Sequence, residues 1–131
     1  MSDKCSFVFS DELLKYKFSN HHPFDQFRLK LTVDLLEKMN ALHPESVIPP
    51  RIASDEELAL IHDLSYIEAV KKAGNGQLSP DIAENYGLGT EDTPIFPNMH
   101  EASALLVGGT LTAVDQVMTG KALHALHLGG G

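Results

Sequence analysis

Residues 122–131 read Ala-Leu-His-Ala-Leu-His-Leu-Gly-Gly-Gly. The seven residues before the glycines predict a short apolar strand. In parallel α/β proteins, ligands bind at the carboxyl ends of strands, where glycines let the backbone approach a substrate closely. The stretch therefore predicts a parallel α/β fold, and we expect the chain to be cut at the threshold of an active site.

The composition of the 131 residues is ordinary for a globular protein, with 43% hydrophobic and 21% charged residues. Residues 1–131 are therefore expected to form a single domain or a piece of one. The formal net charge of −8 argues against a nucleic-acid partner, because such a partner requires clustered Lys and Arg. The charge suits a cationic partner, or it serves solubility alone.

The cysteine content and the N-terminus predict where the protein works. The single cysteine, Cys5, excludes an internal disulfide framework and fits a reducing compartment. The first residues lack a basic segment followed by a long apolar core, and no window approaches about 18 apolar residues. We therefore expect a cytoplasmic protein that is neither exported nor embedded in a membrane.

The first half of the chain is predicted to alternate strands and helices. A strand is expected at 5–10, an amphipathic helix over about 27–42, and an extended passage at 47–53. The apolar residues with helical spacing in the first helix are Leu31, Leu35, Met39 and Leu42. Two capping boxes, each with a hydroxyl at the N-cap and a carboxylate three residues later, are predicted at Ser54–Glu57 and Ser65–Glu68.

The second half is predicted to contain a loop, a long helix and the final strand. Residues 75–97 are rich in Gly, Pro, Asn and Asp without a sustained period, and we interpret them as a binding loop. A buried helix capped by Asn98 is expected to run to Gly120. Gly108 and Gly109 lie in its middle, which suggests that another backbone packs closely there. The order of elements implies parallel strands with crossover helices.

The histidines alone do not indicate a metal site. Seven are present, and a site would need several of them to converge with carboxylates. His124 and His127 are three residues apart on the predicted strand, so alternation points them to opposite faces and favours packing roles over a shared metal. Motifs of zinc peptidases, nucleophile elbows, dinucleotide folds and P-loops are absent from the sequence. A complete active site is therefore not visible.

Two charged residues have two interpretations each. Asp92 precedes a proline-fixed turn, within a window at 73–120 that contains six acids and no Lys or Arg. Its carboxylate either accepts two backbone N–H bonds from an extended peptide, or caps its own loop, which the sequence alone favours. Arg28, at the start of a helix, either forms a surface ion pair or binds backbone carbonyls that line a channel.

Several motifs follow one another in a fixed order. They are His22-Pro23 with Arg28 before a helix, residues 61–67 followed by a helix, residues 86–89 leading to 91–94, the Gly108-Gly109-Thr110 run, and the strand that ends in Gly129-Gly130-Gly131. In this order they resemble the N-terminal third of the histone deacetylase superfamily, and most closely its bacterial acetoin-utilisation deacetylases. The resemblance covers nearly the whole chain from Phe7 onward.

The resemblance implies an arginase/deacetylase fold, a three-layer α/β/α domain with a parallel sheet, in which zinc activates water to attack the amide of an acetylated lysine. It matches Asp92 to the rim aspartate that holds substrate backbone amides, and Arg28 to the arginine beside the channel proposed to release acetate. Gly130 and Gly131 match the glycines that shape the foot of the tunnel. In the family, the catalytic double histidine and the zinc ligands come later, so we expect no catalytic or metal-binding residue within 1–131.

Three functions are compatible with these residues. The first is the N-terminal portion of a zinc-dependent protein lysine deacetylase, inactive by itself, whose implied substrate is an acetylated lysine of a metabolic enzyme such as acetyl-CoA synthetase. An acetylpolyamine or another small acetylated amine is the alternative substrate. The second is a stand-alone binding module that uses the Asp92 loop. The third, a nucleotide-binding domain, is disfavoured because no helix follows the terminal glycines to bind an anion.

A consequence for the isolated chain follows from the first function. If strands that normally pair with these residues are missing, the chain exposes an unpaired strand edge and part of a buried helix face. We therefore expect the isolated 131-residue chain either to self-associate or to be only marginally stable.

Overall fold

The computed structural model describes residues 5–18 and 21–130. Within these ranges the chain forms three parallel strands, in the order β2-β1-β3. The strands are β1 (Cys5–Val8), β2 (Val47–Ile48) and β3 (His124–His127). The helices are η2 (Asp11–Leu14), α1 (Phe27–Lys38), η3 (Pro44–Ser46), α2 (Asp55–Leu58), α3 (Leu64–Gly74), α4 (Pro80–Asn85) and α5 (Met99–Met118). The register places Phe7 of the central strand between Val47 and Leu126.

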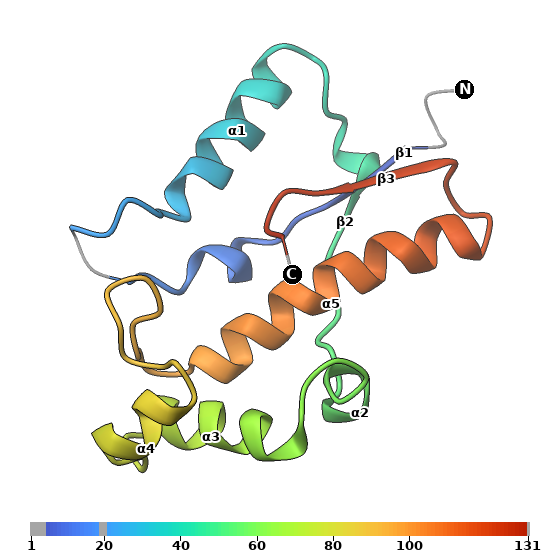
Figure 1. Cartoon of the computed structure of the whole chain (residues 1–131). Helices are drawn as coiled ribbons and strands as arrows, with labels where there is room; N and C mark the ends of the chain where they lie inside the picture. The colour runs from blue at the N-terminus through green and yellow to red at the C-terminus, as the bar shows by residue number, and fades with distance from the viewer. Residues whose placement is uncertain (1–4, 19–20, 131) are drawn as a thin grey trace.

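Helices cover both faces of the sheet, which gives the domain three layers (Figure 1). On one face, Phe7 of β1 packs with Val33 of α1 and with Leu42. On the other face, the Ser6 hydroxyl of β1 donates a hydrogen bond of 3.3 Å to the side-chain oxygen of Gln116 in α5. Successive strand residues point to opposite faces, which is why Ser6 and Phe7 meet different helices. The α/β/α arrangement with a parallel sheet predicted from the sequence is confirmed.

A second core lies between α5 and the short helices that precede it. It is formed by Val70 and Ala73 of α3, Ala83 of α4, Leu88, and Met99 at the start of α5. The segment 75–97, predicted as a structureless loop, therefore contains a helix, α4, whose first turn begins at Pro80. A proline at the first helical position is well tolerated because its missing N–H would have no helical partner there.

Helix α1 buries a different face from the one that the sequence pattern predicted. Its buried residues are Leu29 and Val33. The predicted apolar residues Leu31, Leu35 and Met39 are 56%, 57% and 65% exposed, respectively. Both stripes have helical spacing, so periodicity alone does not decide which of them meets the sheet.

The end of α1 also differs from the prediction. The helix ends at Lys38 because Asn40 takes a left-handed conformation, with φ of 55°. The amides of Ala41 and Leu42 then both donate to the Leu36 carbonyl, which satisfies the helix end. The helix is therefore shorter than the range of about 27–42 that the sequence predicts.

The predicted helix caps have mixed outcomes. The capping box at Ser54 is confirmed, with both the Ser54 and Glu57 side chains bonded to backbone amides. The second capping box is wrong, because α3 begins at Leu64 and its N-cap is Asp63 rather than Ser65. Asn98 is the N-cap residue of α5, but its left-handed conformation leaves its side chain without a capping bond.

The close backbone approach predicted in α5 is confirmed at Gly108. A Cβ atom built on Gly108 would lie 1.7 Å from the Arg51 carbonyl oxygen and 2.9 Å from the Ala53 amide nitrogen. The Ala53 amide donates to the Ala104 carbonyl of α5 at 3.0 Å. The Thr112 hydroxyl accepts from the Arg51 amide at 3.0 Å and donates to the Gly108 carbonyl at 2.8 Å. The extended passage after β2 therefore lies directly on the α5 backbone.

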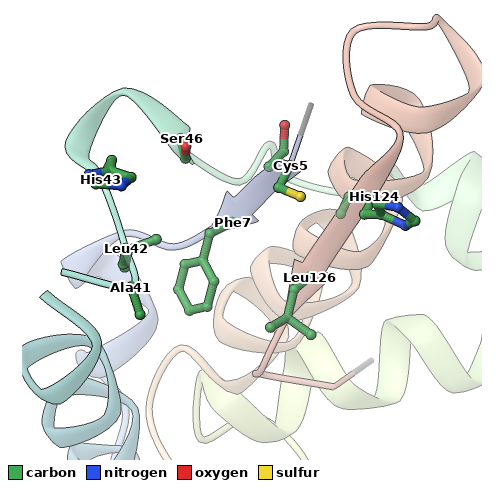
Figure 2. Close-up of a pocket in the computed structure, with 10 residues that line it drawn as sticks. Cys5, Phe7, Ala41, Leu42, His43, Ser46, His124 and Leu126 are labelled. Carbon is green, nitrogen blue, oxygen red and sulfur yellow. The ribbon is translucent and has the colours of Figure 1, made fainter. Parts of the chain in front are cut away.

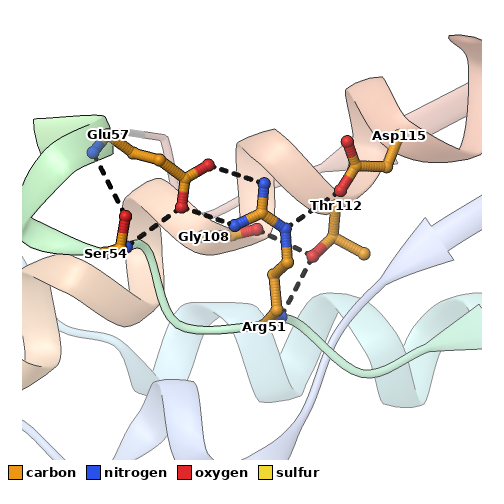
Figure 3. Close-up of polar contacts among 6 residues, drawn as sticks. All are labelled: Arg51, Ser54, Glu57, Gly108, Thr112 and Asp115. Atoms are coloured by element: carbon orange, nitrogen blue, oxygen red, sulfur yellow. Dashed lines mark hydrogen bonds and ion pairs between the residues drawn. The ribbon is translucent and has the colours of Figure 1, made fainter. Parts of the chain in front are cut away.

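Arg51 fixes this passage from its outer side (Figure 3). Its two terminal nitrogens each donate to one Glu57 carboxylate oxygen at 2.8 Å, and Nε donates to Asp115 of α5 at 2.9 Å. The Glu57 carboxylate also accepts from the Ser54 amide at 3.0 Å. The hydrogen bonds from Arg51, followed by those from Ser54, lower the pKa of Glu57 from 4.5 to about 2. The bidentate pair therefore joins the β2 passage, α2 and α5.

We expect the stability of this cluster to be lost in acid. The pKa of Glu57 is lowered by folding, so its contribution is complete above about pH 4.5 and disappears as the pH falls toward about 2. Urea unfolding of Glu57→Gln and the wild type should differ at pH 6 and converge near pH 2. Glu56→Gln, one residue earlier and exposed, is the matched control and should follow the wild type throughout. Equal midpoints for Glu57→Gln and wild type at pH 6 would contradict the prediction.

The structure leaves one side of the sheet open. In the order β2-β1-β3, the strand β3 forms an edge of the sheet as far as the described residues extend. Leu126 on this strand and Val117 and Met118 on α5 are exposed beside it. No helix in the described part of the chain is long and apolar enough to cross a membrane. Self-association through the β3 edge stays a prediction.

Candidate functional site

The carboxyl ends of β1 and β3 point toward the side of the molecule that holds the segment before α1 and the loop between α4 and α5 (Figure 1). Three predicted site elements lie at these places: Arg28 in the first turn of α1, Asp92 in the loop, and Gly130 after β3. The carboxyl ends of parallel strands are where an α/β sheet places its ligands. This side of the molecule therefore holds the candidate functional site.

The loop that presents Asp92 is closed by two threonines. The Thr93 hydroxyl donates to the Gly87 carbonyl at 2.7 Å, and the Thr93 amide donates to the Thr90 hydroxyl at 3.0 Å. The Gly89 amide adds a bond of 2.8 Å to the Thr93 carbonyl. Gly87 and Gly89 have φ of 71° and 85°, a conformation that glycine adopts without strain. The turn is therefore held without the Asp92 carboxylate, which is exposed at its tip.

Of the two interpretations of Asp92, the structure gives no support to the local cap. Within the described ranges, the amides of the loop bond to threonine hydroxyls and carbonyls, and none donates to the Asp92 side chain. A carboxylate that is held in place but left with free acceptor positions can accept N–H bonds from a ligand. Peptide binding by Asp92 itself stays a prediction.

A cavity of about 440 Å³ brings Asp92 together with the segment before α1. Its lining residues are His21, His22, Pro23, Glu91, Asp92 and Pro94. The His22 ring accepts a hydrogen bond on Nδ1 from the Phe24 amide at 3.1 Å, which leaves Nε2–H as the donor of the neutral ring. The cavity thus combines two carboxylates with an imidazole and contains no Lys or Arg among its lining residues.

Aromatic packing holds the two sides of this cavity together. The Phe96 ring, which follows the Asp92 loop, stacks on Tyr16 with centroids 5.6 Å apart and meets Phe18 edge-on at 5.3 Å. Phe18 in turn meets the His22 ring at 4.6 Å. Burial raises the pKa of Tyr16, against a smaller opposite effect of the Gln26 hydrogen bond that its hydroxyl accepts. The rim is therefore fixed by contacts between residues far apart in sequence.

Arg28 lies beside this aromatic cluster. Its guanidinium is 4.3 Å from the centroid of the Phe24 ring, a cation–π contact. In the part of the chain that the structure describes, it forms neither of the two predicted contacts, a surface ion pair or bonds to carbonyls that line a channel. The exposed guanidinium keeps its five N–H donors available for another group.

The glycines after β3 are held against α5. Gly130 has φ of 83°, and its carbonyl accepts a hydrogen bond of 2.9 Å from the Thr110 hydroxyl. The Thr110 hydroxyl also lies 3.2 Å from Nδ1 of His127. Gly131, the other predicted tunnel glycine, lies outside the described residues. His124 is exposed and His127 half-buried, so the two rings lie on opposite faces as alternation predicts.

The described residues do not fit a metal ion. Across 5–18 and 21–130, no group of three or more His, Cys, Asp or Glu side chains is placed to hold one. Cys5, His43 and His124 line a cavity of about 390 Å³ together with Phe7 and Leu126 (Figure 2). Cys5 and His124 begin β1 and β3, so this cavity lies at the amino ends of the strands, away from the Asp92 loop.

Sequence patterns did not indicate several residues of the site. Tyr16, Gln26 and Phe96 carry no motif, and only the folded chain shows that they contact one another or the rim. For His127 a weak signal exists, because Gly109 and Thr110 on the long helix provide space and a hydroxyl of the kind that a buried imidazole requires. That signal becomes specific only when the register of α5 against β3 is known.

Comparisons with known proteins show the family of this chain. The profile of the histone deacetylase domain matches residues 22–131. The acetoin utilization protein AcuC of Bacillus subtilis (strain 168) is 56% identical over 125 residues, covering 95% of this chain and 32% of the relative. AcuC of Staphylococcus xylosus is 49% identical over 131 residues, covering 100% and 34%. The chain thus spans about a third of the length of these relatives.

Solved structures show the same likeness. A crystal structure of an HDAC homolog complexed with SAHA superposes with a TM-score of 0.81 at 26% identity, covering 95% of this chain and 32% of that one. An HDAC homolog from Aquifex aeolicus gives a TM-score of 0.80 at the same identity and coverage. This chain therefore shares the fold of these HDAC homologs over nearly its whole length.

Proposed function

Because this chain belongs to the histone deacetylase family, we propose that it forms the N-terminal part of a zinc-dependent protein lysine deacetylase. In this proposal the whole protein hydrolyses the amide of an acetylated lysine, and this chain supplies its rim and channel residues. In the whole protein, residues outside this chain would hold the zinc, which would supply Lewis-acid activation of water at the amide. In this proposal the chain's own part is to bind and orient the substrate.

The observation that carries the proposal is the Asp92 loop. Thr90 and Thr93 close the turn, so both oxygens of the exposed Asp92 carboxylate can accept N–H bonds from an extended peptide. The neighbouring Nε2–H of His22 is a donor suited to a peptide carbonyl. An acetylated lysine held by its own backbone amides enters the tunnel at a fixed position, and fixed position is a major source of catalytic rate.

Arg28 and the terminal glycines are proposed to act further inside. Arg28 follows Phe24 by four residues, and its guanidinium lies over that ring. We propose that it lines the internal channel through which acetate leaves, where a guanidinium pairs with a carboxylate in two parallel bonds. Gly130 and Gly131 are proposed to form the foot of the tunnel, where side chains would block the acetyl group.

An acetylated polyamine is the second candidate substrate, and a specific observation favours it. The cavity beside Asp92 is lined by two carboxylates, Glu91 and Asp92, and by no Lys or Arg. Such a cavity attracts the free ammonium groups of a polyamine as well as a basic peptide. The two substrates differ in one respect, because a polyamine has no backbone amides for the Asp92 carboxylate to bind.

The proposal is tested on a protein that contains this chain and has about the full length of its AcuC relatives, called here the protein of family length. An acetyl-lysine peptide and an acetylated polyamine are supplied separately, each with and without prior removal of the metal by a chelator. We expect hydrolysis of the peptide that is lost with the metal and restored by zinc. Hydrolysis of the polyamine alone would support the second candidate. No hydrolysis of either, with zinc bound, would leave the binding module as the better explanation.

A further inference from the structure

The imidazole of His127 lies in a slot built from two glycines. A Cβ atom on Gly109 of α5 would lie 2.4 Å from Nε2 of His127, and one on Gly129 would lie 2.8 Å from the same nitrogen. The Gly129 position is also limited by Leu106, whose Cδ2 would be 2.6 Å away. The ring thus occupies space that exists only because both neighbours lack a side chain.

The hydrogen bonds around the ring define its tautomer. The Thr110 hydroxyl has a single proton, and it donates that proton to the Gly130 carbonyl at 2.9 Å. The contact of 3.2 Å between the Thr110 oxygen and Nδ1 of His127 must then have the imidazole as the donor. The ring therefore carries a proton on Nδ1, and a relay of two hydrogen bonds runs from His127 through Thr110 to Gly130.

The other ring nitrogen is consistent with this assignment. Nε2 of His127 is buried and has no hydrogen-bond partner among the described residues. An unprotonated nitrogen leaves only an acceptor unpaired there, whereas a protonated one would bury an N–H, and a charge, against Gly109 and Gly129. Burial also lowers the pKa of His127, which favours the neutral form of the ring. The ring is thus kept as a neutral donor at Nδ1.

We propose that His127 and Thr110 are positioning residues that hold the Gly130 carbonyl against α5 and so fix the peptide plane after Gly130; this inference rests on the proposed deacetylase function. Gly130 has a positive φ and no side chain of its own to restrain it. The peptide plane that follows it would otherwise rotate freely. The relay replaces that freedom with one orientation, at the place where the foot of the tunnel is proposed.

The first test reads the tautomer directly and does not depend on activity. A long-range proton–nitrogen correlation spectrum of the isotope-labelled chain identifies which ring nitrogen of His127 carries the proton. We expect Nδ1 to be protonated in the wild type and the signature to change in Thr110→Val, which removes the acceptor. A wild-type ring protonated on Nε2, or a signature that Thr110→Val leaves unchanged, overturns the proposal.

The second test measures kcat and KM for an acetyl-lysine peptide with the protein of family length. His127→Leu and Thr110→Val should each lower kcat about tenfold, the effect of one lost hydrogen bond, with little change in KM. His127→Asn keeps an N–H near the Nδ1 position and should restore most of the lost kcat. A merely structural role would instead make all three variants lose activity in proportion to their loss of folded protein.

His124→Leu places the same substitution on the exposed face of the same strand and should leave kcat unchanged. A folded His127→Leu protein with wild-type kcat overturns the positioning role. If the wild type with zinc hydrolyses no acetylated amine, the proposed function fails, and the tautomer spectrum still decides whether the relay to Gly130 exists.

Discussion

Replacing Gly108 by alanine is expected to prevent the chain from folding stably. The new Cβ would lie 1.7 Å from the Arg51 carbonyl oxygen and 2.7 Å from its carbon, far inside van der Waals contact. The atoms in the way are backbone, so no side-chain rotation relieves the overlap. We expect a loss of about 4 kcal/mol or more, which is comparable to the whole stability of a marginal domain.

The segment that faces Gly108, residues 51–53, also cannot move away from the helix. Ala53 is bonded to the Ala104 carbonyl, and Arg51 is bonded to Thr112, Asp115 and Glu57. Circular dichroism and urea unfolding measure the effect. The matched control is Gly74→Ala at the end of α3, where the nearest atom would be the Met99 side chain at 3.2 Å, and its stability should stay within about 1 kcal/mol of the wild type. Cooperative wild-type unfolding of Gly108→Ala would contradict the packing described.

Replacing Asp92 by alanine is expected to cost the whole protein most of its activity on peptides. A hydrogen bond to a charged group contributes about 1.5–3 kcal/mol, so losing two such bonds should lower kcat/KM by about a hundredfold or more. Asp92→Asn keeps one acceptor oxygen and should fall between the alanine variant and the wild type. The measurement is steady-state hydrolysis of an acetyl-lysine peptide by the protein of family length.

The same variant separates the proposed substrates. A small acetylated amine without peptide bonds offers no backbone amides, so Asp92→Ala should change its hydrolysis far less than that of the peptide. Asp81→Asn, an exposed aspartate in α4, is the control for a general charge effect and should match the wild type. Equal losses on both substrates would show that Asp92 acts by its charge alone, and no loss on either would remove it from the site.

The elements that depended on local chemistry were predictable from the sequence. The capping box at Ser54 needs only Ser54 and Glu57, and both side chains form the expected bonds. The parallel sheet followed from the alternation of strands and helices. Gly108 in the middle of a helix was informative because a glycine there lowers helix stability unless close packing requires it.

Elements that depended on the rest of the fold were not predictable. In α1, the Leu29–Val33 stripe and the Leu31–Leu35 stripe both have helical spacing, and only contact with the sheet selects the first. The second capping box failed because α3 already begins at Leu64, before Ser65. A local motif therefore indicates that a helix start is possible at a position, and tertiary packing determines which of two neighbouring starts is used.

The candidate site likewise has features that were predictable from the sequence and features that were not. The exposed position of Asp92 before a proline was readable, whereas the threonine bonds that leave its carboxylate free appear only in the folded loop. The partners of Tyr16 and His22 come from segments far along the chain, so no spacing rule connects them. The slot for His127 depends on the register between α5 and β3, and sequence alone does not give that register.

The measurement that tests the central claim most directly is zinc content and acetyl-lysine hydrolysis on two samples. One is the 131-residue polypeptide, verified by an intact mass of 14.3 kDa, and the other is the protein of family length that carries it. We predict zinc-dependent hydrolysis by the longer protein, and neither stoichiometric zinc nor turnover by the 14.3 kDa polypeptide. Turnover by the short polypeptide, or its absence from the zinc-loaded longer protein, would contradict the claim that this chain supplies the rim and channel of a deacetylase but not its catalytic centre.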